Sequence, residues 1–186
     1  MTAFDPFAPR ARAVSRRASL LLCLAALSGC AVRGFDYDPV YIERVFAQPR
    51  FAIDPAAERF LGRMETPVEE KAYLMALEDA LRRSGLAAQP GGVAPDVVRL
   101  EVEMLRITSP SFGEDFETLV ECYYTVTSLK SGRVLFEGKV ASRAASSVFT
   151  SLLSPDRYAD ARNKALQDNV ERFVQTLAAA LGGGER

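Results

Sequence analysis

Three segments in the second half of the chain alternate between hydrophobic and polar residues with a period of two. The hydrophobic positions are Val98, Leu100, Val102 and Met104 in the first segment, Val120, Cys122, Tyr124 and Val126 in the second, and Val134, Phe136 and Val140 in the third. Such alternation predicts strands with one buried face and one face in water. Because Gly132 supplies a tight turn between the second and third segments, we expect an antiparallel meander.

Two further segments carry hydrophobic residues at the spacing of an α-helix. Thr66, Pro67 and Glu69 form a capping box that opens the first helix, and Gly85 ends it. The apolar stripe of this helix consists of Tyr73, Leu74, Leu77, Ala80 and Leu81. The second helix is predicted from Pro155 to Leu181, about 40 Å long, with a stripe of Leu166, Val170, Phe173, Leu177 and Leu181.

The stretch between residues 41 and 64 gives weaker signals. The segments Tyr41–Phe46 and Phe51–Ile53 resemble strands, and Pro49 between them restricts this stretch to the edge of a sheet. Asp54 followed by Pro55 predicts the start of a short helix, which Gly62 ends.

Together these patterns predict an α+β fold. We expect a two-layer sandwich in which an antiparallel meander of three to four strands is covered on one face by two helices. Residues 41–186 are expected to form a single domain around one core. The predicted core contains Leu77, Leu81, Leu100, Val102, Val126, Phe136, Phe173 and Leu177.

The N-terminus has the features of an export signal. Several arginines precede a short apolar run from Ala18 to Leu27, which has about half of the roughly 20 residues that a membrane-spanning helix needs. The sequence Leu27-Ser28-Gly29-Cys30 follows, and it resembles the bacterial lipobox, in which the chain is cut before the Cys and the Cys thiol is acylated. We therefore expect a signal peptide at residues 1–29, cleavage between Gly29 and Cys30, and a lipidated Cys30 followed by a tether to residue 40. A signal without lipidation and a twin-arginine signal at Ser15-Arg16-Arg17 are the alternatives.

The composition narrows the possible chemistry. Hydrophobic residues make up 48% of the chain and charged residues 25%, as in an ordinary globular protein. A net charge of -1 gives no general attraction to nucleic acid. The chain has no His, which excludes catalysis by Ser-His or Cys-His pairs and metal binding through imidazole. No phosphate loop, dinucleotide fingerprint or metal-ligand spacing is present, so we expect no cofactor, no metal and no nucleic-acid partner.

Few residues remain as candidates for chemistry. Cys122 falls on the buried face of its strand, where a thiol is a small core residue rather than a nucleophile. Glu101 and Glu103 share the outer face of another strand, about 7 Å apart, and are expected to be solvated carboxylates. Catalysis by Glu101, Glu103 or the loop residue Asp115 is the alternative. Asn169 lies at the edge of an apolar helix stripe, where it forms a structural hydrogen bond or contacts a ligand.

Two predicted loops carry hydrophobic side chains. The loop from Ala144 to Leu153 contains Val148, Phe149, Leu152 and Leu153, and Phe112 lies in the loop between the first two strands of the meander. Apolar loop residues form a surface for a partner, or they fold back and close the end of the core. Both roles remain open at this point.

The whole pattern resembles a known group of proteins. The lipobox, the helix that ends in Ser84-Gly85, the meander and the long closing helix with Asn169 are similar to small proteobacterial lipoproteins of the YajG type and to auxiliary lipoproteins of envelope transport systems. The resemblance implies a non-enzymatic accessory or binding component that docks an envelope protein or a lipid. Lipoprotein sorting in that group implies the outer membrane, on its periplasmic face, because Ala31 rather than Asp follows Cys30. The alternatives are an envelope hydrolase or transferase and a purely structural lipoprotein.

Overall fold

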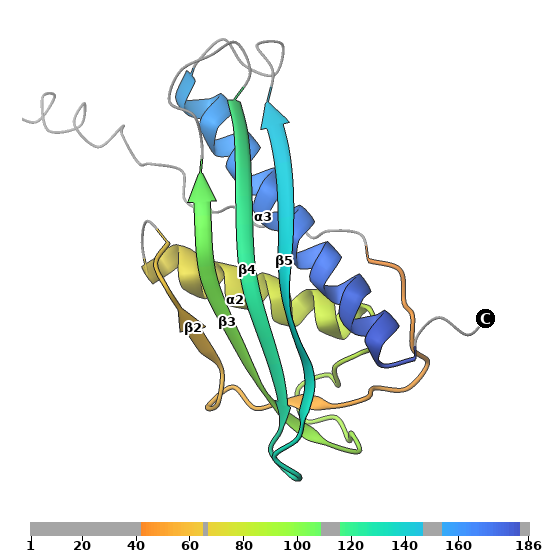
Figure 1. Ribbon diagram of the computed structural model, residues 1–186. Helices are drawn as coiled ribbons and strands as arrows, with labels where there is room; N and C mark the ends of the chain where they lie inside the picture. Colours follow the sequence, from red (N-terminus) through yellow and green to blue (C-terminus); the bar gives the residue numbers. More distant parts are fainter. Residues whose placement is uncertain (1–41, 65–66, 109–115, 147–153, 183–186) are drawn as a thin grey trace, which may run out of the picture. The chain divides into compact units, whose positions relative to one another are not determined.

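A computed structural model describes residues 42–64, 67–108, 116–146 and 154–182 of the chain. It confirms the α+β fold: one sheet lies in one layer, and two helices cover one of its faces (Figure 1). The meander consists of β3 (Val97–Thr108), β4 (Phe116–Ser128) and β5 (Val134–Ser146), which pair antiparallel in the order β3-β4-β5. The helices are α2 (Pro67–Arg83) and α3 (Ser154–Ala180), close to their predicted limits.

Two short strands extend the sheet beyond the predicted meander and make it mixed. β1 (Ala52–Ile53) and β2 (Arg59–Leu61) both pair with β3, and both run parallel to it. The prediction that Phe51–Ile53 lies at a sheet edge is therefore confirmed. The sheet therefore extends beyond β3 by two short parallel strands that the alternating pattern did not predict.

The short helix predicted after Asp54 is wrong. The Asp54 carboxylate accepts a 3.0 Å hydrogen bond from the N–H of Ala56, so this residue closes a turn instead of capping a helix. The chain then enters β2, where Phe60 packs edge-on against the ring of Tyr73 in α2. Pairing with β3 and burial of Phe60 outweigh the weak helix signal.

The predicted strand at residues 41–46 is also wrong over its described part, residues 42–46. Instead, the N–H groups of Val45 and Phe46 both donate to the carbonyl of Ser84 at the end of α2, at 2.8 and 3.2 Å. The neighbouring Gly85 has a φ of +79°, and a Cβ at this position would lie 2.2 Å from the Phe46 carbonyl oxygen. Glycine is therefore required where this segment crosses the end of α2.

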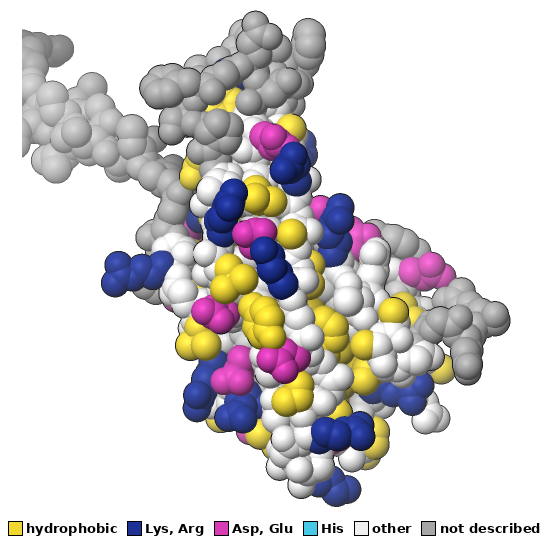
Figure 2. Space-filling view, in the orientation of Figure 1, with side chains coloured by type: hydrophobic (Ala, Val, Ile, Leu, Met, Phe, Trp, Pro, Cys, Tyr) yellow, Lys and Arg dark blue, Asp and Glu magenta, His cyan; other side chains and the backbone are white. Residues whose placement is uncertain are grey.

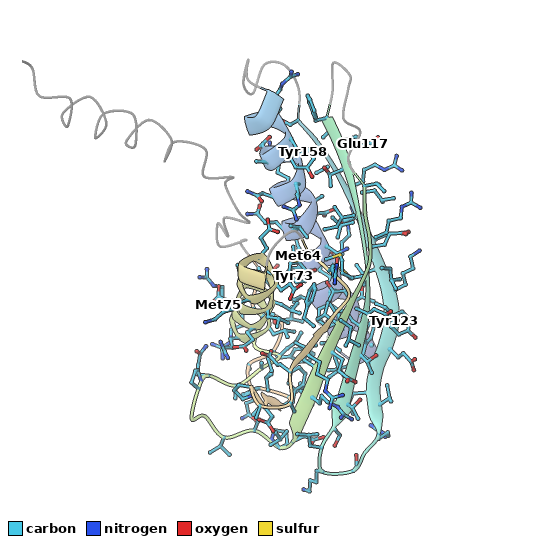
Figure 3. All side chains as sticks on the ribbon, turned by 90° about the vertical axis from the view of Figure 1, so that its left-hand side faces the viewer. Met64, Tyr73, Met75, Glu117, Tyr123 and Tyr158 are labelled. Carbon is cyan, nitrogen blue, oxygen red and sulfur yellow. The ribbon has the colours of Figure 1, made fainter. Side chains whose placement is uncertain are left out.

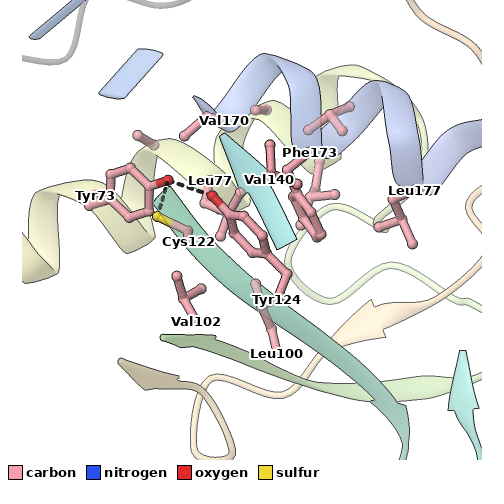
Figure 4. Packing of buried hydrophobic residues seen from close by; sticks show 14 of the residues in the cluster. Tyr73, Leu77, Leu100, Val102, Cys122, Tyr124, Val140, Val170, Phe173 and Leu177 are labelled. Carbon is pink, nitrogen blue, oxygen red and sulfur yellow. Dashed lines mark hydrogen bonds between the residues drawn. The ribbon is translucent and has the colours of Figure 1, made fainter. Parts of the chain in front are cut away.

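All eight predicted core residues belong to the hydrophobic core between the sheet and the helices, shown in part in Figure 4. Seven are buried, and Phe136 is partly buried against Phe173, with ring centroids 5.6 Å apart. Phe173 also stacks on Tyr124 at 3.9 Å.

The alternation predicted for β5 holds from Phe136 to Val140 but not at Val134, which is 46% exposed. The register between β4 and β5 shifts at Val126 and Thr127, and this irregularity changes the side to which Val134 points. At its other end, β5 continues to Ser146, so the first residues of the loop predicted from Ala144 belong to the strand.

Candidate functional site

Most of the predicted functional residues lie outside the described part of the chain. This applies to Gly29, Cys30, Phe112, Asp115, Val148, Phe149, Leu152 and Leu153. Their roles stay predictions, and the described residues place only the ends from which their loops depart. Within the described ranges, no helix is long and apolar enough to cross a bilayer.

The fold brings the two apolar loops to the same end of the sheet. β3 ends at Thr108 and β4 begins at Phe116, while β5 ends at Ser146, which pairs directly with Phe116. The loop with Phe112 and the loop with Phe149 therefore both leave the sheet here. We call this region, defined by Thr108, Phe116 and Ser146, the loop end (Figure 1).

Arg157, which the sequence pattern did not single out, packs against the loop end. The guanidinium of Arg157 lies over the ring of Phe116, 4.8 Å from its centroid, and both side chains are buried. A cation over an aromatic face is stabilised by the ring quadrupole, more so when water is excluded. The signal was present in the sequence, because Arg157, Ala161 and Ala165 follow one another at intervals of four on the buried stripe of α3.

A buried ion pair joins the two helices. Both terminal nitrogens of Arg162 in α3 donate to the two carboxylate oxygens of Glu69 in α2, at 2.6 and 3.1 Å. The side chains are 4% and 2% exposed. The fork of the guanidinium matches the carboxylate, which compensates the loss of hydration of both charges. The predicted capping partner of Glu69, Thr66, lies outside the described residues.

A network of buried polar side chains connects both helices to the middle of the sheet. The Asn169 carbonyl oxygen in α3 accepts from the hydroxyls of Tyr124 in β4, at 2.6 Å, and of Tyr73 in α2, at 3.2 Å. The two hydroxyls lie 2.5 Å from each other, and Figure 4 shows them meeting between the layers. The Asn169 amide nitrogen donates to the Val140 carbonyl at 3.1 Å and to Ser142 Oγ at 3.2 Å. Asn169 is fully buried and hydrogen-bonded within the protein, which confirms the structural interpretation of this residue.

Cys122 lies beside this network as a buried thiol. Its sulfur is 3.7 Å from the Tyr73 hydroxyl and 3.6 Å from the sulfur of Met104. Burial raises the pKa of the Cys122 thiol to about 11, so it is protonated at neutral pH. The prediction of a core residue is confirmed, and a protonated thiol is a poor nucleophile.

The outer face of the sheet carries the carboxylates considered for catalysis. Glu101 lies 3.7 Å from both Arg59 and Arg99, and Glu121 lies 2.6 Å from Lys139. The hydrogen bond from Lys139 lowers the pKa of the Glu121 carboxyl. Figure 2 shows acidic and basic side chains mixed over this face, and Figure 3 shows Glu117 and Tyr123 directed away from the helices. Glu101 and Glu121 lie beside cations and Glu103 is exposed, whereas a general acid needs a desolvated carboxyl.

Several open hollows border the C-terminal end of α2. One, of about 430 Å³, is lined by Arg44, Arg82, Arg83, Gly85 and Val93 among others. Arg82 and Arg83 bind Glu78 and Asp79 of the same helix, and Arg44 donates to the backbone carbonyls of residues 46 and 47. Since these cations already have partners, the hollow is not a dedicated anion site. Among the described residues no group of three metal-ligating side chains occurs.

Among the carboxyl groups in the described part of the chain, Glu58, just before β2, has a strongly raised pKa. Partial burial and a hydrogen bond with the Glu78 carboxyl raise its pKa to about 8, although Arg82 acts in the opposite direction. One oxygen of Glu58 is buried without a hydrogen-bond partner. The protonated form is therefore favoured near neutral pH, where it donates a hydrogen bond to Glu78.

No protein-family model matches the chain, and no curated protein matches it in sequence. Solved structures with a similar fold include protein XCC0632 from Xanthomonas campestris, described by the family model DUF330, with a TM-score of 0.52 and 16% identity over 78% of this chain and 96% of that one. A candidate lipoprotein from Caulobacter crescentus gives a TM-score of 0.48 and 14% identity over 70% and 94%. Lipoprotein GNA1162 from Neisseria meningitidis gives 0.41 and 13% over 70% and 99%. Of these three, the first shows a shared fold, and none singles out the YajG type.

We expect replacement of Asn169 by Leu to destabilise the protein by about 3 kcal/mol or more. The change keeps the branched shape and the number of side-chain heavy atoms but leaves the hydroxyls of Tyr73 and Tyr124 without their common acceptor, at about 1–3 kcal/mol for each buried group. Urea unfolding followed by circular dichroism measures the loss. Gln175→Leu, on the exposed side of the same helix, is the control and should change the free energy of unfolding little. A loss below 1 kcal/mol for Asn169→Leu would mean that the network does not hold the layers together.

The raised pKa of Glu58 predicts a stability that depends on pH. Its folded pKa lies above the unfolded value, so its favourable contribution is complete below about pH 4.5 and is lost as the pH rises through about 8. No His titrates in this range, because the chain has none. We expect the free energy of unfolding to fall between pH 5 and 9, and Glu58→Gln to reduce that slope. Glu103→Gln, which removes an exposed charge from the outer face, should retain the slope. Equal slopes for the wild type and Glu58→Gln would contradict the assignment.

Proposed function

We propose that the chain is a lipid-anchored lipoprotein of the outer membrane, facing the periplasm, and that it acts as a non-enzymatic accessory or binding component of the cell envelope. The observation that carries this proposal is the sequence Leu27-Ser28-Gly29-Cys30 at the end of a short apolar run. Acylation of Cys30 would fix the chain to a bilayer, because several acyl chains together give durable anchoring.

The length of chain after Cys30 is consistent with such an anchor. The twelve residues from Cys30 to the first described residue, 42, reach at most about 40 Å. A domain on so short a tether would work close to the membrane surface. Ala31 after Cys30 favours the outer membrane.

The binding role is supported by the arrangement of the core and of the loop end. The interior polar groups of Tyr73, Tyr124 and Asn169 bond to one another and leave no donor set directed toward a substrate. The two apolar loops leave the sheet at one end, where Phe112 and Phe149 would form a common surface for an envelope protein or a lipid.

Loss of the Cys30 thiol tests the anchor. We expect Cys30→Ala to stop incorporation of an alkyne fatty acid and either to release the protein from the membrane fraction or to leave an uncut precursor. Cys23→Ala, inside the apolar run, is the matched control and should still be lipidated and processed. Full fatty-acid labelling of the Cys30→Ala protein would refute lipidation at this residue.

Charge on the second loop tests the docking surface. We expect Phe149→Glu to abolish the specific crosslinks that the protein forms in intact cells with an envelope protein or a lipid, as read by mass spectrometry. Val93→Glu is the control, because Val93 is 92% exposed and precedes β3 at the other end of the sheet. If Phe149→Glu captures the same species as the wild type, the loop end is not the docking surface. Turnover of an envelope substrate that Glu101→Gln abolishes would replace the accessory role with an enzymatic one.

A further inference from the structure

β5 is the last strand of the sheet, and in the described part of the chain its strand partner is β4 alone (Figure 1). The strand is long, with residues Val134–Ser146. A free edge of this length presents backbone donors and acceptors along one side, which suits pairing with another strand.

The hydrogen bonds of Asn169 show which backbone groups of β5 face the free side. Its amide nitrogen lies 3.1 Å from the Val140 carbonyl and 3.4 Å from the Val120 carbonyl. Both carbonyls can approach one atom so closely only if they lie between β4 and β5. Since the direction alternates along a strand, the backbone groups of Val140 and of the other even-numbered residues near it face β4. Those of the odd-numbered residues, such as Lys139 and Ala141, face outward.

The charged side chains of the odd-numbered residues of β5 distinguish the registers in which this strand could pair with β5 of a second copy. In an antiparallel pair centred on Val140, Glu137 of each copy lies opposite Arg143 of the other, and Lys139 lies opposite Ala141. Centring on Lys139 places this residue opposite itself, and centring on Ala141 places Lys139 opposite Arg143 twice. Like charges directly opposite each other destabilise a sheet, whereas opposite charges stabilise it.

The helix-facing side favours the same register. Val140 meets Val140, Gly138 meets Ser142, and the partly buried Phe136 meets the small Ala144. The regular part of β5 from Phe136 to Ala144 is then fully paired, and the irregularity next to Val134 lies outside this range. A pair centred on Gly138 also places Glu137 opposite Lys139, but it leaves the last residues of the strand without a partner.

We propose that β5 pairs antiparallel with β5 of a second copy of this chain, centred on Val140, so that one sheet continues across the dimer. Both members of the new pair are accessible for it: the side chain of Arg143 is 65% exposed, and Glu137 is exposed as well. Arg143 binds Glu117 at 3.1 Å, and Glu137 accepts from the Tyr123 hydroxyl at 2.7 Å. A guanidinium with five donors and a carboxylate with about four acceptor sites retain these bonds and form the new pair. The proposal is independent of the lipid anchor.

The test measures the self-association of the purified, processed chain by sedimentation at low salt. We expect the wild type to dimerise, and Ala141→Pro to be monomeric, because it removes an outward N–H while a proline at a sheet edge leaves the monomer folded. Glu137→Arg and Arg143→Glu should each raise the dimer Kd about tenfold or more. Mixing these two variants should restore dimers, because the mixed pair has opposite charges at both contacts.

Lys139→Glu identifies the register. With Val140 at the centre, Lys139 faces Ala141, and the variant should associate like the wild type. Association lost in Lys139→Glu but not in Arg143→Glu would overturn the register. A wild type that stays monomeric at protein concentrations up to about 100 μM would overturn the dimer. A dimer that Ala141→Pro leaves unchanged would also overturn it. Circular dichroism of each variant confirms that a lost dimer is not a lost fold.

Discussion

The need to satisfy one buried amide determines how the layers of this protein fit together. Asn169 has no contact with water, so each of its polar atoms must find a partner inside the protein. Its oxygen accepts hydrogen bonds from the hydroxyls of Tyr73 in α2 and Tyr124 in β4. Its nitrogen donates to Val140 and Ser142 in β5. A shift of α3 by one turn would break these bonds together. Hydrophobic packing holds the layers against each other without direction, and this amide selects one position among many.

The second directional contact, between Glu69 and Arg162, fixes the two helices to each other. This ion pair and the Asn169 network therefore engage buried polar groups in holding the helices and the sheet together. What remains for function lies at the periphery of the described domain: the loop end, the free edge of β5 and the outer face with its paired charges. This distribution agrees with the binding role proposed above, because a binding surface needs accessible groups.

The parts of the fold that the sequence predicted are those with a long, regular period. The meander and α3 repeat their pattern over many residues, so a local irregularity such as that at Val134 changes little. β1 and β2 were missed as parallel partners of β3, because two or three residues carry no period and their pairing depends on distant segments. For the same reason the sequence indicated a hydrogen bond for Asn169 but not its partners, and it gave no sign that Glu69 would meet Arg162. The loop residues around Phe112 and Phe149 and the acylation of Cys30 stay predictions.

The contact between Gly85 and the segment at Phe46 has a mechanical consequence. A chain tethered at its N-terminus experiences any pull first at the point where it joins the folded body. In the described part of the chain, this junction includes the Ser84 carbonyl, to which Val45 and Phe46 donate, and not a strand of the sheet. The next attachment is at Arg50 and Phe51, which donate to Leu86. Tension would therefore be absorbed in two successive steps around the end of α2, and β3, β4 and β5 would keep their register while the first residues of the domain peel away.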